Sequence, residues 1–265
     1  MIFNETELRK VGRGTDNPPG FEHWTLDRHY RLMANITLTG GGWEPIGAFS
    51  TPFTGSFNGG GFNISGLTIN LPNTTIADGV GMFVYNEGTI ENFNLINVNI
   101  TSGSTSSGNI VGGLVSHNFA IIRNITVQGN VTELLGGGIS TIVPGVVGWN
   151  AGIVQNSAAL SQSMTTPAGG GGNFGRVYGA MTGTSPRINN HARSDMVFIH
   201  GTTPQPDFPD PVASDPSRHG ADVSPGTLPG QFNNQYFWET TLGWDFTNVW
   251  QMQGSPPLPA LRQPQ

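Results

Sequence analysis

Three copies of one pattern, separated by a fixed interval, constrain the fold of this 265-residue chain more than any other feature of its sequence. The copies read GMFVYNEGTIENFNL, GLVSHNFAIIRNITV and GVVGWNAGIVQNSAA. They begin at Gly81, Gly113 and Gly145, which lie 32 residues apart in each case. A fixed period of about thirty residues is typical of one supersecondary unit copied along an axis. The repeat therefore predicts a solenoid.

Each unit has the pattern of a strand rather than a helix. Apolar and polar residues alternate at 67–69, 93–95 and 125–127, which is the period of a half-buried strand. The apolar runs are short, Gly, Asn and Ser separate them, and the chain has a single lysine, Lys10. We predict an all-β fold, a right-handed parallel β-helix (solenoid) with a short N-terminal helical cap and an aromatic-rich C-terminal cap.

In a parallel β-helix, equivalent residues of successive coils stack in columns about 4.8 Å apart. The repeat predicts three inward columns, which are Phe83/Val115/Val147, Ile90/Ile122/Val154 and Phe93/Ile125/Ser157. Upstream, GSFNGGGFNISGLTI aligns with the Gly81 copy at an offset of 26, which places Phe57 on Phe83. Downstream, a drifted copy is expected to place Asn190 on Asn156, at an offset of 34.

Two asparagines recur in every copy, and we predict that they occupy corners of the coils. Asparagine tolerates the left-handed backbone region, and its amide can bond the adjacent backbone. Stacked amides can also bond one another from coil to coil. We assign structural rather than ligand-binding roles to Asn86, Asn118 and Asn150 at the first corner, and to Asn92, Asn124 and Asn156 at the second.

The composition argues against several classes of function. A net charge of −6 and a pI near 5.4 disfavour nucleic-acid binding, which needs a basic surface. No apolar run approaches the length of a membrane span, and the absence of cysteine excludes disulfides and thiolate metal sites. Asn-x-Ser/Thr triplets occur at Asn4, Asn35, Asn63, Asn73, Asn99, Asn124 and Asn130, and we attribute them to the Asn- and Thr-rich strands rather than to glycosylation.

We expect a single domain over residues 1–265, with a cap at each end. Residues 1–30 form the N-terminal cap, which starts with a short helix that Asn4 caps. The coils occupy residues 31–200. Residues 201–265 form an irregular loop, rich in Pro, Gly, Asp and Ser, and then the C-terminal cap.

The irregular loop contains three acidic residues, Asp207, Asp210 and Asp215. Carboxylates are calcium ligands, so a calcium site is conceivable, but the spacing matches no defined calcium-binding loop. We therefore expect a solvated loop, no metal site and no cofactor.

The end of the chain concentrates aromatic residues in FNNQYFWETTLGWDFTNVW. Such a block can cover the last hydrophobic coil, which any solenoid requires. It can also recognise a ligand, because large aromatic side chains supply binding area. We favour the covering role, and we name Tyr236, Trp238, Trp244 and Trp250 as candidate binding residues.

The units GLVSHNFAIIRNITV and GVVGWNAGIVQNSAA resemble the GLUG repeat, a short motif of bacterial surface proteins. The segments before and after them are similar to those that flank GLUG arrays, so the resemblance covers most of the chain. That family is associated with secreted or surface-anchored proteins, including noncatalytic parts of immunoglobulin A-cleaving metalloproteases. The resemblance implies an extracellular or cell-surface location and a scaffold or adhesive role, and it supplies no catalytic residue.

Two functions remain open at the level of the sequence. The first is a noncatalytic surface or adhesin-type module whose partner is a glycan or a protein on a host or neighbouring cell, without nucleic acid and without a membrane span in this chain. The alternative is a carbohydrate-active β-helix enzyme, a polysaccharide lyase or hydrolase, which needs paired carboxylates or a metal in one groove. Glu87, Glu91 and Arg123 are the residues that such an enzyme could use, although a surface ion pair explains Glu91 and Arg123 equally well.

Overall fold

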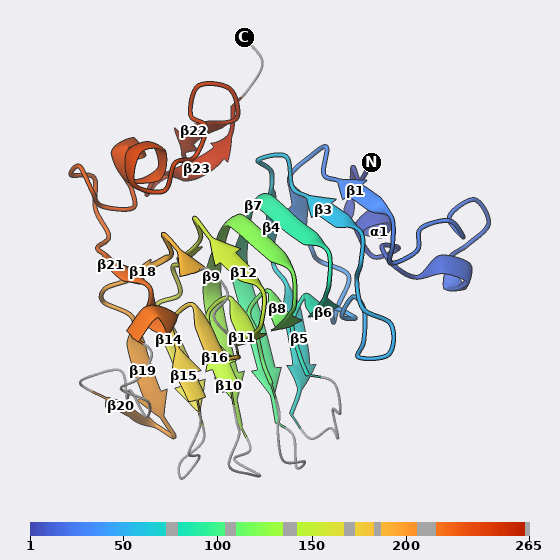
Figure 1. Cartoon of the computed structure of the whole chain (residues 1–265), viewed down its shortest axis with the longest axis horizontal. Helices are drawn as coiled ribbons and strands as arrows, with labels where there is room; N and C mark the ends of the chain where they lie inside the picture. The colour runs from blue at the N-terminus through green and yellow to red at the C-terminus, as the bar shows by residue number, and fades with distance from the viewer. Residues whose placement is uncertain are drawn as a thin grey trace.

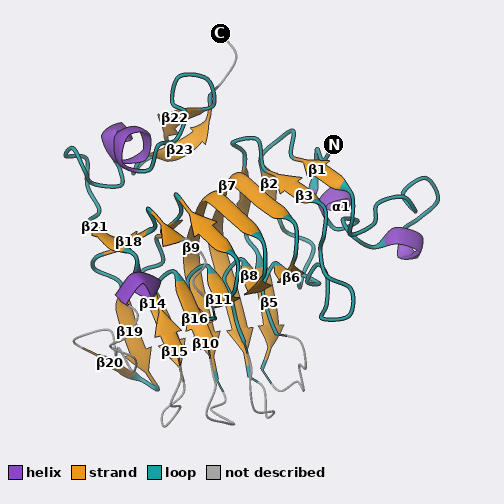
Figure 2. Cartoon of the chain, in the orientation of Figure 1, coloured by secondary structure: helices purple, strands orange, loops and turns teal. Residues whose placement is uncertain are grey.

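The computed structural model describes residues 1–72, 79–103, 110–134, 142–166, 173–182, 187–205 and 216–262. Nearly all of its regular structure is β-strand, and strands of successive coils lie parallel and side by side (Figure 1). The few helices are short and lie in the N-terminal and C-terminal parts of the chain (Figure 2). The chain is a parallel β-solenoid, which confirms the predicted architecture.

The described strands form four sheets. The largest has 15 strands: β1 (His29–Arg31), β2 (Ile36–Thr37), β3 (Ser56–Asn58), β4 (Asn63–Ser65), β5 (Thr68–Leu71), β7 (Thr89–Ser102), β9 (Ile121–Glu133), β12 (Ile153–Gln155), β13 (Ala158–Ala159), β14 (Ser163–Thr166), β17 (Arg187–Ile188), β18 (His191–Arg193), β19 (Val197–His200), β20 (Thr203–Gln205) and β21 (Ala221–Val223). The second has 4 strands: β6 (Phe83–Asn86), β8 (Val115–Asn118), β11 (Val147–Asn150) and β16 (Tyr178–Met181). Two pairs complete the set, a parallel pair of β10 (Ile142–Pro144) with β15 (Asn173–Gly175) and an antiparallel pair of β22 (Trp250–Gln253) with β23 (Leu258–Leu261).

The 32-residue period of the sequence is the step from one coil to the next. Phe83 pairs with Val115, and Val115 pairs with Val147. In the second column, Ile122 pairs with Ile90 on one side and with Val154 on the other. In the third column, Phe93 pairs with Ile125, and the Ile125 N–H donates to Ser157 Oγ at 3.3 Å. All nine residues of the three predicted columns are buried with no exposed surface, so the repeat builds the core of the solenoid.

Aromatic side chains fill the first coils. The ring of Phe83 lies 5.2 Å from that of Phe53 and 5.6 Å from that of Phe57, and Phe57 lies 5.4 Å from Phe93. These tilted and edge-on contacts are the preferred geometry of aromatic pairs. The next two coils carry Val, Ile or Ser at the three column positions, and a buried ring returns at Tyr178, which pairs with Val147.

The second asparagine of each repeat unit turns the chain through a corner. Asn92, Asn124 and Asn156 have φ angles of 64°, 53° and 51°, in the left-handed region that asparagine tolerates better than other side chains. Because β7 and β9 each pass through such a corner, one long strand lines two sides of the coil. The backbone at each of these corners therefore needs a residue that tolerates a positive φ.

Two sequence alignments outside the central repeats are wrong. Phe57 pairs with Ile90 and not with Phe83, because GSFNGGGFN matches the start of β7 rather than β6. Downstream, Asn189 and not Asn190 follows Asn156, with a φ of 58° and an offset of 33. The observed offset is 33 residues in both places, against the predicted 26 and 34. Apolar matches alone did not fix the register, because unequal insertions separate these copies from the central repeats.

The N-terminal cap begins with α1 (Glu5–Leu8), followed by the short 3-10 helix η1 (Gly14–Asp16). Asn4 Oδ1 accepts a hydrogen bond from Glu7 N at 2.9 Å, as the sequence predicts for the helix cap. Leu8 is buried without exposed surface, and it joins the main core. The cap thus closes the apolar end of the first coil.

Glu5 ties this helix to the chain that follows β2. Its carboxylate accepts hydrogen bonds from Thr39 N at 3.0 Å, from Gly40 N at 2.8 Å and from Arg9 Nε at 3.0 Å. Burial opposes ionisation of Glu5, but the backbone hydrogen bonds from Thr39 and Gly40 outweigh it and lower the pKa to about 2 from an ordinary value of 4.5. The N-terminal cap is therefore held by a carboxylate that stays ionised well into the acid range.

At the other end, several segments cover the edges of the last strands. The 3-10 helix η2 (Pro216–His219) contacts β16, β21 pairs with β18, and the antiparallel strand β20 pairs with β19. The buried Arg218 donates from Nη1 to the carbonyl of Gly179 in β16 at 2.9 Å. Covered edges of this kind prevent further strands from adding to the stack.

Candidate functional site

The aromatic residues near the C-terminus form a separate small core, which we call the C-terminal block (residues 232–262). Trp244 lies between Trp238 and Trp250, with ring centroids 4.9 and 4.4 Å away. These three tryptophans are 0–2% exposed, whereas Tyr236 is 51% exposed. Of the four candidate binding residues, only Tyr236 therefore presents its ring to solvent.

The C-terminal block packs along the side of the solenoid, against the corner that the second asparagine column makes (Figure 1). Trp244 Nε1 donates to the carbonyl of Asn156 at 2.9 Å, and Asn189 Nδ2 donates to the carbonyl of Thr241 at 2.5 Å. Thr241 ends η3 (Phe237–Thr241), the π-helix of the block. The asparagine corners thus position the nonrepeating end of the chain as well as the coils.

A cleft of about 450 Å³ lies between the hairpin of the C-terminal block and the coils. The coils contribute Asn35, Asn63, Asn94 and Ile96, and the hairpin contributes Gln253, Gly254, Pro256, Leu258, Pro259 and Ala260. The volume falls in the range of small-molecule sites, and the lining combines apolar surface with a few convergent polar groups. None of the described residues that line the cleft is charged.

Hydrogen bonds fix the floor of the cleft. Asn94, which is 2% exposed, donates from Nδ2 to Asn63 Oδ1 at 2.8 Å and to the carbonyl of Pro259 at 2.6 Å, and its Oδ1 accepts from Thr126 Oγ1 at 2.7 Å. Asn35 Oδ1 in turn accepts from Asn63 N at 2.9 Å. One asparagine in each of three coils therefore lies along the cleft, and the deepest of them holds the hairpin in place.

Gly61 permits the close approach of the hairpin to the coils. Its φ is +89°, and a Cβ at this position would lie 2.9 Å from Leu261 Cδ1 and 3.4 Å from Val249 Cγ1. Only glycine satisfies both the backbone angle and the contact without strain.

The first asparagine column forms a buried amide ladder. Asn86 Nδ2 donates to Asn118 Oδ1 at 2.7 Å, and Asn118 Nδ2 donates to Asn150 Oδ1 at 2.8 Å. Asn150 pairs with Met181 in the next coil, and its Nδ2 has no acceptor within the part of the chain that the structure describes. These asparagines are 0–1% exposed, which fits a structural role and leaves them without a face for a ligand.

An aromatic column beside that ladder was missed by the sequence reasoning. Tyr85, His117 and Trp149 occupy one register position of the second sheet, and the rings of Tyr85 and His117 stack at 4.2 Å with an interplanar angle of 7°. Phe49 and Phe119, which contact Tyr85, are 69% and 46% exposed. The signal was present, because YN, HN and WN precede the corner in the three copies. The stacked rings point their faces at one another, so the column stabilises the coils more than it offers a flat surface.

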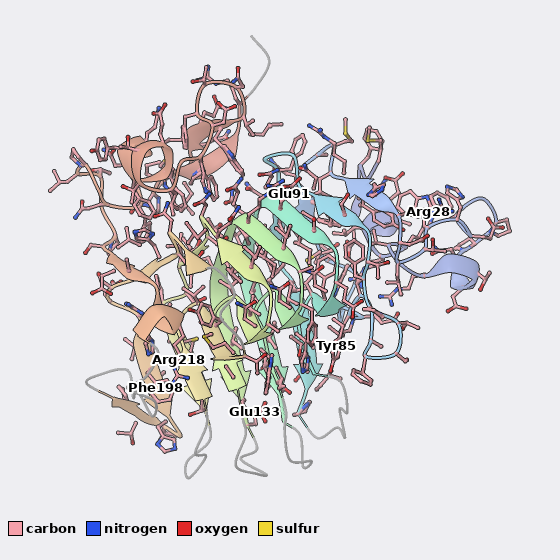
Figure 3. The ribbon with its side chains drawn as sticks, in the orientation of Figure 1. Arg28, Tyr85, Glu91, Glu133, Phe198 and Arg218 are labelled. Atoms are coloured by element: carbon pink, nitrogen blue, oxygen red, sulfur yellow. The ribbon has the colours of Figure 1, made fainter. Side chains whose placement is uncertain are left out.

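Glu87 and Glu91, the acidic residues considered for an enzyme, do not line the cleft. Glu91 pairs with Arg123, as the period predicts, with Arg123 Nε 2.6 Å from Glu91 Oε2. Asn58 Nδ2 donates to Glu91 Oε1 at 2.7 Å, so both carboxylate oxygens are engaged. In Figure 3, Glu91 lies near the top of the coils and Tyr85 lies lower on the right-hand side. Glu87 is exposed on the turn before β7.

The described residues hold no group of three or more His, Asp or Glu side chains arranged for a metal ion. Asp207, Asp210 and Asp215, the residues considered for calcium, lie outside the described residues. Among the helices that the structure describes, none is long and apolar enough to cross a membrane.

Comparisons with known proteins give partial matches, and no family model matches the chain. A provisionally named Gly-rich membrane protein of Evansella cellulosilytica is 33% identical over 108 residues, which is 38% of this chain and 12% of that protein. Halomucin of Haloquadratum walsbyi is 34% identical over 125 residues, 43% of this chain and 1% of halomucin. The chain thus spans a small fraction of the curated relatives that it matches. A crystal structure of a provisionally assigned immunoglobulin A1 protease from Bacteroides ovatus superposes with a TM-score of 0.45 and 16% identity, over 99% of this chain and 91% of that one.

Proposed function

We propose that this chain is a noncatalytic module of an extracellular or cell-surface protein, in which a β-solenoid presents a binding surface to a glycan or a protein. The observation that carries the proposal is the cleft between the C-terminal hairpin and the coils. It is the place where a nonrepeating segment meets the repeating scaffold, and it combines apolar lining with amide groups from three coils.

The chemistry of the cleft favours binding over catalysis. Hydrolysis of a glycosidic bond needs two carboxyl groups that flank the bond, and the ten residues that line the cleft include no Asp, Glu or His. Glu91, an acid considered for the enzyme hypothesis, is held by Asn58 and Arg123, as in a structural ion pair. An array of solvated amides and apolar groups can recognise a ligand without reacting with it.

The named relatives support a surface location. One is named a Gly-rich membrane protein and the other a halomucin, and the matched stretch is a small part of each. A solenoid is suited to such a setting, because stacked coils give a long body whose side carries the ligand site away from the point of attachment. The GLUG resemblance agrees with this proposal.

The proposal is tested by measuring binding and turnover side by side. The chain is applied to an array of glycans and extracellular matrix proteins, and the same preparation is incubated with soluble polysaccharides whose reducing ends are assayed. We expect saturable binding without release of reducing ends. Turnover that is lost in Glu91→Gln or in Glu87→Gln would refute a noncatalytic module, and so would the absence of binding to every member of the array.

A further inference from the structure

The cleft beside the C-terminal hairpin has an entrance and a floor of different character. At the entrance, Asn35 and Gln253 are exposed, whereas Asn94 and Pro259 at the floor are buried. Asn63 is half-buried between them. A ligand that enters therefore meets exposed amides first and a buried, hydrogen-bonded floor last.

The amides at the entrance keep hydrogen-bonding capacity for a ligand. Asn35 and Asn63 each use Oδ1 to accept a bond within the scaffold, and within the described residues neither Nδ2 has a protein acceptor. The amide of Gln253 has no protein partner there either. Each primary amide carries two donors and a carbonyl acceptor, so the three groups offer a mixed set of donors and acceptors with no net charge.

This donor and acceptor set matches a neutral polyol. Vicinal hydroxyl groups of a sugar each donate and accept, which a pair of side-chain amides complements. Apolar surface from Ile96, Leu258 and Pro256 lies beside the amides and can cover the C–H face of a sugar ring. A charged ligand would have no counter-charge in the cleft, and leaving its charge unpaired would be costly.

An extended peptide is a poorer fit. Adding a strand requires a free edge, but β4 is paired on both sides, with β2 and β7. On the hairpin, Pro259 in β23 has no N–H to donate, and its carbonyl is occupied by Asn94 Nδ2. At β4 and at Pro259, a peptide would therefore lack the main-chain bonds that give strand addition its affinity.

The buried tryptophans Trp244 and Trp250 hold the hairpin in position beside the cleft. Trp250 is the first residue of β22, and it packs in the core of the C-terminal block behind the hairpin. Trp244 anchors the block to Asn156. These residues position the hairpin wall of the cleft and do not line it, so they act on a ligand indirectly.

We infer that the cleft binds one or two sugar units of a neutral saccharide, through the amides of Asn35, Asn63 and Gln253 and the apolar surface of Ile96 and Leu258. This assignment rests on the proposed function, because it names the ligand class and the site for the binding surface.

The test uses the full chain, labelled with ¹⁵N, and neutral hexasaccharides of glucose, xylose and mannose. A hexasaccharide of galacturonic acid and a neutral hexapeptide are run in parallel. Affinity is measured by calorimetry, and the side-chain amide resonances of Asn35 and Gln253 are followed during the titration. The variants are Gln253→Ala, Asn35→Ala/Gln253→Ala and the matched control Asn99→Ala, an exposed amide on β7 outside the cleft. Their melting temperatures are compared with wild type to confirm that each folds.

We expect a neutral hexasaccharide to bind and to shift the side-chain amide signals of Asn35 and Gln253. Loss of one amide contact should weaken binding by about three-fold or more, the double variant should weaken it by at least about ten-fold, and Asn99→Ala should leave it unchanged. Because the side-chain amide of Gln253 makes no hydrogen bond within the described residues, and its backbone pairing with Leu258 is kept in the alanine variant, Gln253→Ala tests the site with little disturbance of the fold.

Other outcomes separate the inference from the proposed function. Sugar binding that survives in the double variant, preference for the galacturonic acid hexasaccharide, or binding of the hexapeptide alone would overturn the assignment of the cleft and leave a binding module intact. Failure to bind any ligand in this set and in the glycan and protein array would overturn both.

Discussion

Removing one rung of the buried amide ladder should destabilise the solenoid by an amount that the hydrogen bonds predict. Asn118 accepts from Asn86 at 2.7 Å and donates to Asn150 at 2.8 Å, and it is 0% exposed. Asn118→Ala removes two ladder bonds, at about 1 kcal/mol each, and leaves the Asn86 amide without its best acceptor, which adds about 1 kcal/mol. The expected loss is about 3 kcal/mol. For a chain of this size that corresponds to a fall in melting temperature of about 6–12 °C.

The position allows a clean measurement. Asn118 lies outside the set of residues with positive φ, so alanine introduces no backbone strain and the change reports on the side chain. Unfolding in urea, followed by circular dichroism and tryptophan fluorescence, gives the free energy for wild type, Asn118→Ala and the exposed control Asn99→Ala. A loss below about 1 kcal/mol, or one equal to that of the control, would refute the structural reading of the asparagine column.

Four further predictions concern other parts of the fold. Because Glu5 has a folded-state pKa of about 2 against an ordinary value of 4.5, stability should fall as the pH drops from about 4.5 to 2, and Glu5→Gln should flatten that part of the profile measured by urea unfolding. Phe57→Ala should cost about 3–5 kcal/mol, measured in the same way, because it opens a cavity among the aromatic rings of the first coils. Gly61→Val should displace the C-terminal block, because a side chain there meets Leu261, and the tryptophan emission of the block should shift to longer wavelength while the circular dichroism of the coils is kept. Glu91→Gln should change the free energy of unfolding by at most about 1 kcal/mol, since the ion pair of Glu91 with Arg123 is partly exposed. A larger loss of stability would contradict the assignment of Glu91 and Arg123 as a surface ion pair of little energetic weight.

The coil step could be read from the sequence because each inward position repeats with similar chemistry. Phe83, Val115 and Val147 are all apolar, are 32 residues apart and are buried in one column. The second asparagine column was equally readable, since only a few residue types tolerate a positive φ. Where copies are separated by unequal insertions, the same reasoning failed by one residue and assigned the Asn189 corner to Asn190.

The candidate site could not be read in this way, because it depends on contacts between distant parts of the chain. Asn94 and Pro259, which join the coils to the hairpin, are 165 residues apart. The aromatic end was recognised as a cap or a binding surface, but its burial could not be known from composition. Asn35 and Asn63 do carry a local signal of their alignment, because each directly precedes one of two paired strand residues, Ile36 and Ile64. The sequence analysis considered both asparagines only as parts of Asn-x-Ser/Thr triplets.

The most direct test of the stacked-coil architecture is a disulfide that can form only if the register is correct. The chain has no cysteine, so introduced pairs are the only thiols. Asn99 on β7 pairs with Asn130 on β9, and both are exposed. Adjacent parallel strands place such partners about 4.8 Å apart, whereas Asn99 and Thr132 would lie about 8 Å apart, which exceeds the reach of a disulfide.

Oxidation of Asn99→Cys/Asn130→Cys and Asn99→Cys/Thr132→Cys, followed by mass spectrometry of the peptides, measures the register. The stacked-coil architecture predicts rapid and complete cross-linking of the first pair and little cross-linking of the second. Equal cross-linking of both pairs, or preference for Asn99 with Thr132, would contradict the parallel register on which the fold and the candidate site depend.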